Sequence, residues 1–357
     1  MNKRGKISYV FASSNTSQGF YTFIPDLIAG LKRVYILKGA TGTGKSTFIR
    51  LLGEAIAEQG YEVEFWISAA DGVSADGVYI PQLDTALVNG SLPQPIDPGY
   101  PAGREVIINL GAYWDNQQDD DKAQELAQLA GKFQLYSHQV THSLKDAIQV
   151  QAKIKKINAQ HLNPDKMAKL IQDVSARIME NRSRGKHYFA SVVTAEGMIN
   201  YLDEISSQCS KRYIFQGPTG GGTSAIISKL ASQLKEHGYT MDYYHCGLEP
   251  EDIVMVIIRN LQIALVDGSY KEIPAQPGDI IIDVKICLDN YDEELVKAQT
   301  SELQRNYETF ILQAQKDLEE AQRALKEIKK INSAAMNFEP VQQKRQQIWE
   351  EIVKSDC

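Results

Sequence analysis

Two glycine-rich stretches of the chain have the residue types and spacing that bind phosphate. The first glycine loop, GATGTGKST at 39–47, fits the pattern GxxxxGK[ST]. The second glycine loop, GPTGGGTSA at 217–225, keeps most of these glycines but has Thr223 in place of the lysine. Glycines allow consecutive backbone N–H groups to wrap an anion, and a helix that follows directs its positive dipole end at the same place. The first glycine loop therefore predicts a site for a nucleoside triphosphate.

We expect this loop to bind ATP or GTP together with Mg²⁺. The residues expected to contact the nucleotide are the nine of the loop: Gly39, Ala40, Thr41, Gly42, Thr43, Gly44, Lys45, Ser46 and Thr47. Lys45 is the expected catalytic cation at the β- and γ-phosphates, and the Ser46 hydroxyl is an expected metal ligand. The second glycine loop lacks this cation, so we expect a copy that does not catalyse phosphoryl transfer.

A carboxylate that anchors the metal should follow a neighbouring strand, and here the two copies differ in the opposite sense. TALVNG ends its apolar run with Asn89, whereas IALVDG ends with Asp267. The first copy therefore needs another carboxylate, and ligands bind beyond the carboxyl ends of parallel strands. The best candidates, both as catalytic residues and as metal ligands, are Asp71 and Asp76 in ISAADGVSADG. Weaker candidates are Asp84 and Asp97. The alternative for each aspartate is a turn role beside glycine.

The chain repeats itself along much of its length. Residues 11–91 align with 189–269 without a gap at an offset of 178, and ALVNGS falls on ALVDGS. After a four-residue deletion the offset becomes 174, which places the pentapeptide IKKIN at 154–158 on IKKIN at 328–332. Matches that stay in register over this length predict a tandem duplication.

Each copy combines an α/β part with a helical part. RVYIL at 33–37 is a predicted strand before the first glycine loop, and YEVEFWI begins the next strand after the helix. Strands that alternate with helices predict a parallel sheet covered on both faces. Apolar heptads between Asp119 and Asn158 predict a helix of about 40 residues, roughly 60 Å long. A shorter helix returns after it, and 292–332 and 340–354 repeat this design.

We therefore expect an α/β fold that is a tandem duplication of a P-loop NTPase core, with each copy followed by a long helical hairpin. The four expected segments are a first core at 1–116, a hairpin at 117–185, a degenerate core at 186–290 and a hairpin at 291–357. The hairpins are longer than a core needs, so we expect them to project and to bind a protein partner or another copy of the chain.

Composition limits the class and the compartment. The chain has 357 residues, a net charge of −7 and 43% apolar residues, as in ordinary globular proteins. Its acidity argues against broad binding to nucleic acid or anionic lipid. The four cysteines form no CxxC pair, and the most apolar segment, 253–266, is too short and too polar to cross a membrane. We expect a cytoplasmic protein with no membrane partner.

The chain resembles an uncharacterised family of duplicated bacterial P-loop NTPases, described only as ATPases or nucleotide-kinase-like proteins. The resemblance rests on SSNTSQGFY, ILKGATGTGKST, the DGV at 76–78, and ALVNG followed by PIDPGYP and EVIINLG. The family pattern has aspartate at Asn89 and histidine at Gln94, so this chain departs from it at two positions near the expected site. The resemblance implies a nucleotide but no particular reaction.

Three functions follow from these expectations. The leading one is Mg²⁺-dependent nucleotide binding with slow hydrolysis, in which the energy moves the helices or a partner. A small-molecule or nucleotide kinase is the second, with Asp71 or Asp76 orienting an acceptor hydroxyl. A nucleotide-sensing scaffold with negligible turnover is the third, and Asn89 favours it.

Overall fold

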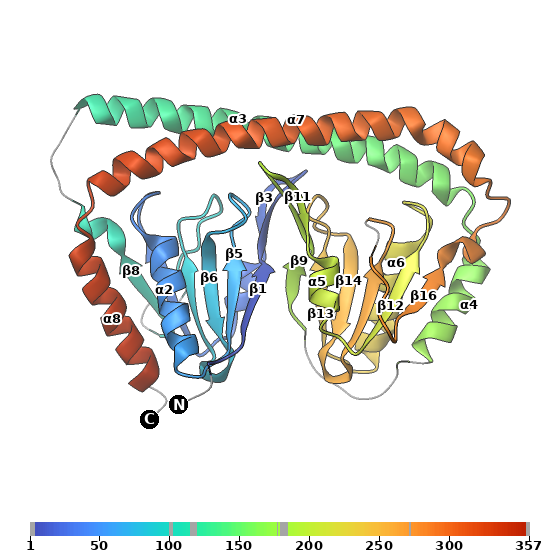
Figure 1. Ribbon diagram of the computed structural model, residues 1–357, viewed down its shortest axis with the longest axis horizontal. Helices are drawn as coiled ribbons and strands as arrows, with labels where there is room; N and C mark the ends of the chain where they lie inside the picture. The colour runs from blue at the N-terminus through green and yellow to red at the C-terminus, as the bar shows by residue number, and fades with distance from the viewer. Residues whose placement is uncertain are drawn as a thin grey trace.

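The computed structural model describes residues 4–99, 103–114, 120–176, 178, 185–270 and 273–354. Figure 1 shows two α/β halves side by side, with a pair of long helices lying across both. One mixed sheet of 12 strands runs through the molecule in the order β16-β12-β15-β14-β13-β9-β1-β5-β6-β7-β4-β8. The α/β class predicted from the sequence is confirmed.

The order of element types in the first half of the chain recurs in the second half. The first half comprises β1 (Ile7–Phe11), β2 (Ser13–Thr16), β3 (Gly19–Thr22), α1 (Ile24–Ile28), β4 (Arg33–Lys38), α2 (Lys45–Glu58), β5 (Val63–Ile67), β6 (Ala75–Ile80), η1 (Pro81–Leu83), β7 (Thr85–Asn89), β8 (Glu105–Asn109), η2 (Leu110–Tyr113), α3 (Asp120–Ala159) and α4 (Pro164–Ser175). The second comprises β9 (His187–Phe189), β10 (Ser191–Thr194), β11 (Gly197–Asn200), α5 (Leu202–Ser206), β12 (Lys211–Gln216), α6 (Thr223–Glu236), β13 (Met241–His245), β14 (Ile253–Ile258), η3 (Arg259–Leu261), β15 (Ile263–Asp267), β16 (Ile280–Asp283), η4 (Val284–Cys287), α7 (Glu293–Ala334) and α8 (Phe338–Lys354).

The expected parallel sheet is wrong at one strand in each half. β6 runs antiparallel to β5 and β7, and β14 runs antiparallel to β13 and β15. The other neighbours within each half are parallel. The reason is the length of the connections, because a parallel crossover needs a dozen or more residues and β6 is joined to β7 only through η1. The halves meet where β1 and β9 pair antiparallel at Phe11 and Phe189.

The long helices pack against each other and not against their own return helices. α3 and α7 lie antiparallel along one another across the top of the view in Figure 1. The return helices are exchanged, since α4 packs on α6 of the second half and α8 packs on α2 of the first. Ile171 and Val174 of α4 are accordingly buried in one apolar cluster with α6, and Ile348 and Ile352 of α8 are buried in the cluster that contains α2. The expected projecting hairpins at 117–185 and 291–357 are therefore wrong.

Helix length explains this exchange. α3 has 40 residues, as the heptads predict, so it is about 60 Å long. Twelve strands spaced about 4.8 Å apart span about 53 Å. A helix that begins beside β8 at one edge of the sheet therefore ends near β16 at the other edge. The heptad positions of α3 lie along α7: Val140, Ala147, Val150 and Ile154 are buried, whereas Leu126, Leu129, Phe133 and Tyr136 are half-buried.

The turns after the long helices dock on the opposite half at equivalent places. Asn163 N, after α3, donates to Cys287 O at 2.7 Å, and Asn337 N, after α7, donates to Tyr113 O at 3.0 Å. These four residues correspond pairwise at the offset of 174. In each half, the 3-10 turn that follows the last strand (η2 or η4) thus contacts the turn that follows the long helix of the other half.

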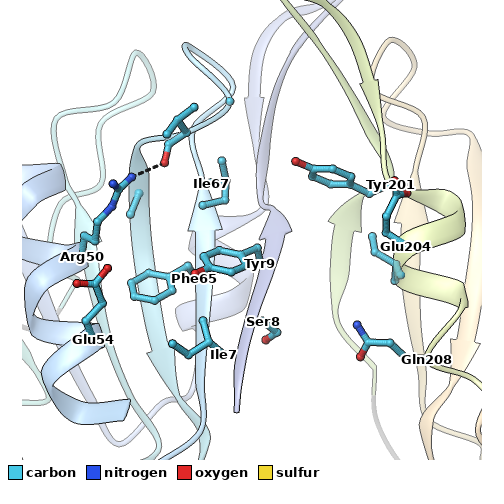
Figure 2. A pocket seen from close by; sticks show the side chains of 14 residues that line it. Ile7, Ser8, Tyr9, Arg50, Glu54, Phe65, Ile67, Tyr201, Glu204 and Gln208 are labelled. Atoms are coloured by element: carbon cyan, nitrogen blue, oxygen red, sulfur yellow. Dashed lines mark hydrogen bonds between the residues drawn. The ribbon is translucent and has the colours of Figure 1, made fainter. Parts of the chain in front are cut away.

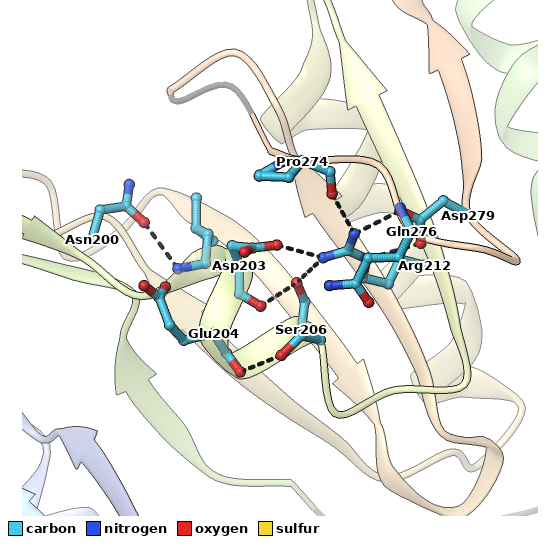
Figure 3. Close-up of polar contacts among 10 residues, drawn as sticks. Asn200, Asp203, Glu204, Ser206, Arg212, Pro274, Gln276 and Asp279 are labelled. Carbon is cyan, nitrogen blue, oxygen red and sulfur yellow. Dashed lines mark hydrogen bonds and ion pairs between the residues drawn. The ribbon is translucent and has the colours of Figure 1, made fainter.

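A buried cation stabilises the second half at the end of the sheet away from the second glycine loop. Arg212 on β12 is 1% exposed. Figure 3 shows its guanidinium donating to the carboxylates of Asp279 and Asp203 at 2.6–2.9 Å, to Pro274 O at 2.8 Å and to Ser206 Oγ at 3.3 Å. These bonds join β12 to α5 and to the loop before β16.

Candidate functional site

The first glycine loop connects β4 to α2 and adopts backbone conformations that favour glycine. Gly39, Gly42 and Gly44 have φ values of 143°, 96° and 88°, in the region where a β-carbon is strained. Gly44 caps the N-terminus of α2, so that the 14-residue helix begins at Lys45. The strand, loop and helix thus place the positive end of a helix dipole at the loop.

The Lys45 side chain folds back into the first glycine loop. Its Nζ donates to Gly39 O at 2.7 Å and to Ala40 O at 2.9 Å, and the residue is 7% exposed. Burial lowers the pKa of Lys45 to about 8, although the negative charge of Asp76 opposes this fall, and Lys329 lowers the pKa further. The loop therefore contains a poorly solvated cation that an anionic ligand would stabilise.

Asp76 lies on β6 beside Asn89, which ends β7. Its Oδ1 accepts from Asn89 Nδ2 at 3.3 Å, whereas its Oδ2 is buried without a hydrogen-bond partner. Burial raises the pKa of Asp76 to about 6. Asn89 Oδ1 accepts from Ser91 N at 3.1 Å. The Asn89 amide at the end of β7 therefore contacts a carboxylate on the adjacent strand β6.

Asp71 lies in the turn between β5 and β6, and its carboxylate is already engaged. It accepts from Val73 N at 3.1 Å and from Ser74 N at 2.7 Å, and its Oδ2 lies 3.7 Å from Lys329 Nζ. Burial pushes the pKa of Asp71 upward, but the hydrogen bonds from Ser74 and Val73 and the charge of Lys329 produce a net fall. Asp71 thus stabilises the turn, and Asp76 has the unpartnered oxygen.

The two weaker candidates have other partners. Asp84 follows η1, adopts a left-handed conformation and accepts from Lys32 N at 3.0 Å. This is the amino end of β7, whereas the first glycine loop follows the carboxyl end of β4. Asp97 pairs with Lys38 Nζ at 2.5 Å. Neither carboxylate contacts Lys45 through any described bond.

The end of α7 completes the surroundings of the first glycine loop, which sequence reasoning missed. Asn332 Nδ2 donates to Thr41 O at 2.7 Å, and Ser333 Oγ donates to Gly42 O at 3.0 Å. A β-carbon on Gly42 would lie 2.7 Å from Lys329 O, so only glycine allows this close approach. The signal was present in the sequence, because Lys329 and Asn332 belong to the second IKKIN.

The first IKKIN contacts the second glycine loop in the same way. Asn158 Nδ2 donates to Thr219 O at 2.9 Å, as Asn332 does to Thr41. Lys155 Nζ pairs with Glu249 at 2.5 Å and with Asp252 at 2.7 Å. Each pentapeptide therefore lies on the glycine loop of the opposite half, where it places one lysine and one asparagine.

The second glycine loop keeps the backbone conformation but not the cation. Gly220 and Gly222 have φ values of 81° and 102°, and α6 begins at Thr223. Thr223 is 3% exposed, and its hydroxyl lies 3.5 Å from Ser269 Oγ. Asp267 accepts from Ser269 N at 2.8 Å, and burial raises the pKa of Asp267 to about 6. A buried carboxylate thus remains here without the lysine.

The donor set of the first loop fits a nucleotide-bound Mg²⁺ ion. Within the described residues, no group of three or more His, Cys, Asp or Glu side chains is arranged to hold a metal by itself. Such a group is not needed, since Mg²⁺ in nucleotide sites takes one or two protein oxygens and completes its shell with phosphates and water. The unpartnered Oδ2 of Asp76 and the hydroxyl of Ser46, in the first turn of α2, are suitable oxygens.

Comparison with known proteins finds no family model, no curated protein and no solved structure that matches this chain. Of the helices in the described ranges, none is both long enough and apolar enough to span a membrane.

Proposed function

We propose that the first glycine loop binds a nucleoside triphosphate with Mg²⁺ and hydrolyses it slowly. The observation that carries this proposal is the pairing of a buried cation with a buried, incompletely bonded carboxylate. Lys45 is held inside the loop, and Asp76 is near enough for its charge to oppose the fall in the pKa of Lys45. Phosphoryl transfer needs both a cation at the phosphates and an oxygen that holds Mg²⁺.

Each group has one role in this proposal. The backbone N–H groups of the loop and the N-terminus of α2 bind the phosphates. Lys45 Nζ then donates to phosphate oxygens in place of the loop carbonyls. Ser46 and Asp76 hold the metal ion, which neutralises charge on the phosphates. Lys329 adds a second cation from α7, because its charge already acts on both Lys45 and Asp76.

We further propose that the chain is a tandem duplication of a P-loop NTPase core whose second copy is degenerate. The repeated element order and the equivalent docking of both IKKIN segments support this reading. Hydrolysis transfers the γ-phosphoryl group to water and releases a nucleoside diphosphate and phosphate. The second copy lacks a lysine for this reaction.

A kinase remains the second candidate because a cavity adjoins the turn that carries Asp71. The cavity measures about 570 Å³ and includes Gly72 and Val73. Figure 2 shows Arg50 and Glu54 of α2 on one side, Tyr201 and Glu204 on the other, and aromatic rings on the sheet between them. An acceptor bound there would lie beside Asp71.

The deciding experiment uses the full chain with γ-labelled ATP, Mg²⁺ and a panel of small hydroxyl compounds. We expect labelled phosphate to be released without a phosphorylated acceptor. Lys45→Ala should abolish this release and weaken triphosphate binding by roughly 1.5–3 kcal/mol, as expected for a charge-assisted contact. Lys229→Ala, which removes an exposed cation from α6, is the matched control and should behave like the unmodified protein. Unchanged turnover in Lys45→Ala would place the chemistry elsewhere, and a labelled acceptor would favour the kinase.

A further inference from the structure

A second cavity lies beside the second glycine loop. It measures about 520 Å³, within the range of small-molecule sites. Its walls come from both long helices, the β10–β11 hairpin and the loop itself, and include Gln151 of α3, Tyr307 and Ile311 of α7, and Thr219. Because each half contributes a helix, the cavity exists only in the assembled chain.

Two positions in the wall of this cavity are apolar where the equivalent residues of the first half are polar. Val254 and Cys246 line it and are almost fully buried. Their equivalents at the offset of 178 are Asp76 and Ser68. The second half thus lacks the carboxylate that we propose to hold the metal in the first half, and β14 has an apolar surface at this position. Such a surface favours an uncharged ligand over a phosphate.

One buried acceptor in the wall has no partner. Gln151 is 7% exposed, and its Oε1 makes no hydrogen bond. A buried acceptor without a donor is unfavourable, so a ligand N–H or O–H that reached this oxygen would be bound specifically. Tyr270 and Tyr307 also line the cavity, and aromatic rings pack well against a flat, apolar ligand.

The charges around the cavity disfavour an anion. Lys155 is paired with both Glu249 and Asp252, so its charge is more than balanced. Burial is the main cause of a strong rise in the pKa of Tyr270, which lines the cavity, and Cys246, Asp252, Asp267 and Glu249 raise it further. Glu308 also lines the cavity, so most of the charged groups placed here are carboxylates, in contrast to the first glycine loop with Lys45 and Lys329.

We propose that this cavity binds an uncharged aromatic small molecule that donates a hydrogen bond to Gln151. The second half is then a binding site of a different chemical class and not an empty copy of the first. This inference stands whether or not the first glycine loop turns over a nucleotide.

The test uses two fluorescent probes that share one scaffold. N-phenyl-1-naphthylamine is uncharged, has two aromatic parts and carries one N–H donor; 8-anilinonaphthalene-1-sulfonate adds a negative charge. We expect the full chain to bind the uncharged probe saturably, at one site, and at least tenfold more tightly than the sulfonate. Absence of saturable binding, or equal affinity for both probes, would overturn the proposal.

Three variants locate the probe. Ile311→Trp fills the second cavity and should abolish binding, whereas Val73→Trp, on the rim of the 570 Å³ cavity, should leave it unchanged. Gln151→Leu keeps the shape of the side chain and should weaken binding about three- to tenfold, the usual effect of one hydrogen bond. Loss of binding in Val73→Trp alone, or full affinity in Gln151→Leu, would contradict the assignment. Circular dichroism confirms that each variant is folded.

Discussion

Each half keeps one buried carboxylate near its glycine loop, but the two halves place it on different strands. In the first half it is Asp76 on β6, in contact with Asn89 on β7. In the second half it is Asp267 on β15, and the position equivalent to Asp76 is Val254. Neighbouring strands are about 4.8 Å apart, so a carboxylate can change strands and still reach the same space. This is why Asn89 does not remove the acid from the first site.

Asp76→Asn should make the ligand-free protein more stable at pH 7. Burial raises the pKa of Asp76 from 3.8 to about 6, so the folded state binds more protons than the unfolded state between those values. The stability therefore falls as pH rises from about 4 to 6. The free energy of unfolding of the variant should no longer depend on pH in this range and should be about 2–3 kcal/mol larger at pH 7. Its Mg²⁺-dependent ATP binding should be weaker. Urea unfolding at pH 4.5 and 7 measures both effects on stability.

Asp71→Asn is the control, for which we expect the opposite effect on stability at pH 7. The pKa of Asp71 is lowered by the hydrogen bonds of its turn, so its contribution is present above the ordinary aspartate pKa and is lost as pH falls through the lowered value. We expect the free energy of unfolding of this variant to be about 1 kcal/mol smaller at pH 7. A gain in stability would show that the turn does not depend on the charged carboxylate.

Thr223→Lys should raise nucleotide binding in the second half. Gly220, Gly222 and the start of α6 already have the required backbone, and Asp267 remains beside them. Titration calorimetry with ATP and Mg²⁺ should find one site in the unmodified protein and a second, weaker site in the variant. Two equal sites before the substitution would mean that Thr223 does not disable the second loop.

At the scale of elements, α7 makes the first site depend on the second half. Lys329→Met should weaken triphosphate binding about tenfold, equivalent to roughly 1.4 kcal/mol, because it removes a cation whose charge acts on Lys45 and Asp76. Lys155→Met is the equivalent change at the second glycine loop and should not affect this binding. Equal effects from both variants would indicate a general loss of stability, which thermal unfolding would reveal.

The helices were the most predictable elements and their partners the least. Apolar heptads located α3 and α7 to within two residues, because a long period-3.5 pattern has few other structures. The same pattern identifies the apolar face of a helix but does not identify the helix that packs against it. A hairpin would pair each long helix with the next helix along the chain. The two long helices pack on each other instead, because each is as long as the whole sheet is wide.

The candidate site was predictable in part for a similar reason. The first glycine loop could be found because its glycines and Lys45 are contiguous. The sequence does not distinguish Asp71 from Asp76, since ADGVYI, which forms strand β6, contains a glycine and does not have a clear strand pattern. Lys329 and Asn332 are almost 300 residues from the loop, and only the repeated IKKIN hinted that they share a role.

At the scale of the whole molecule, the exchange predicts that the connection between the halves is dispensable for their association. A protease site introduced between residues 178 and 185 should yield two fragments that remain together in gel filtration. α4 is packed on the second half and α8 on the first, and α3 is packed along α7. The fragments should separate only in denaturant. Separation in native buffer would show that these contacts are too weak to hold the halves.

The position of α8 also sets an order of events during synthesis. α2 leaves the ribosome early, but the helix that covers it, with Ile348 and Ile352 buried against the first half, comes last. About 280 residues separate them, so at 5–20 residues per second the apolar side of α2 waits on the order of 15–55 s for its cover. During that time the nascent chain exposes a surface that a chaperone can bind, and a ribosome that stalls within α7 leaves a first half that cannot finish folding.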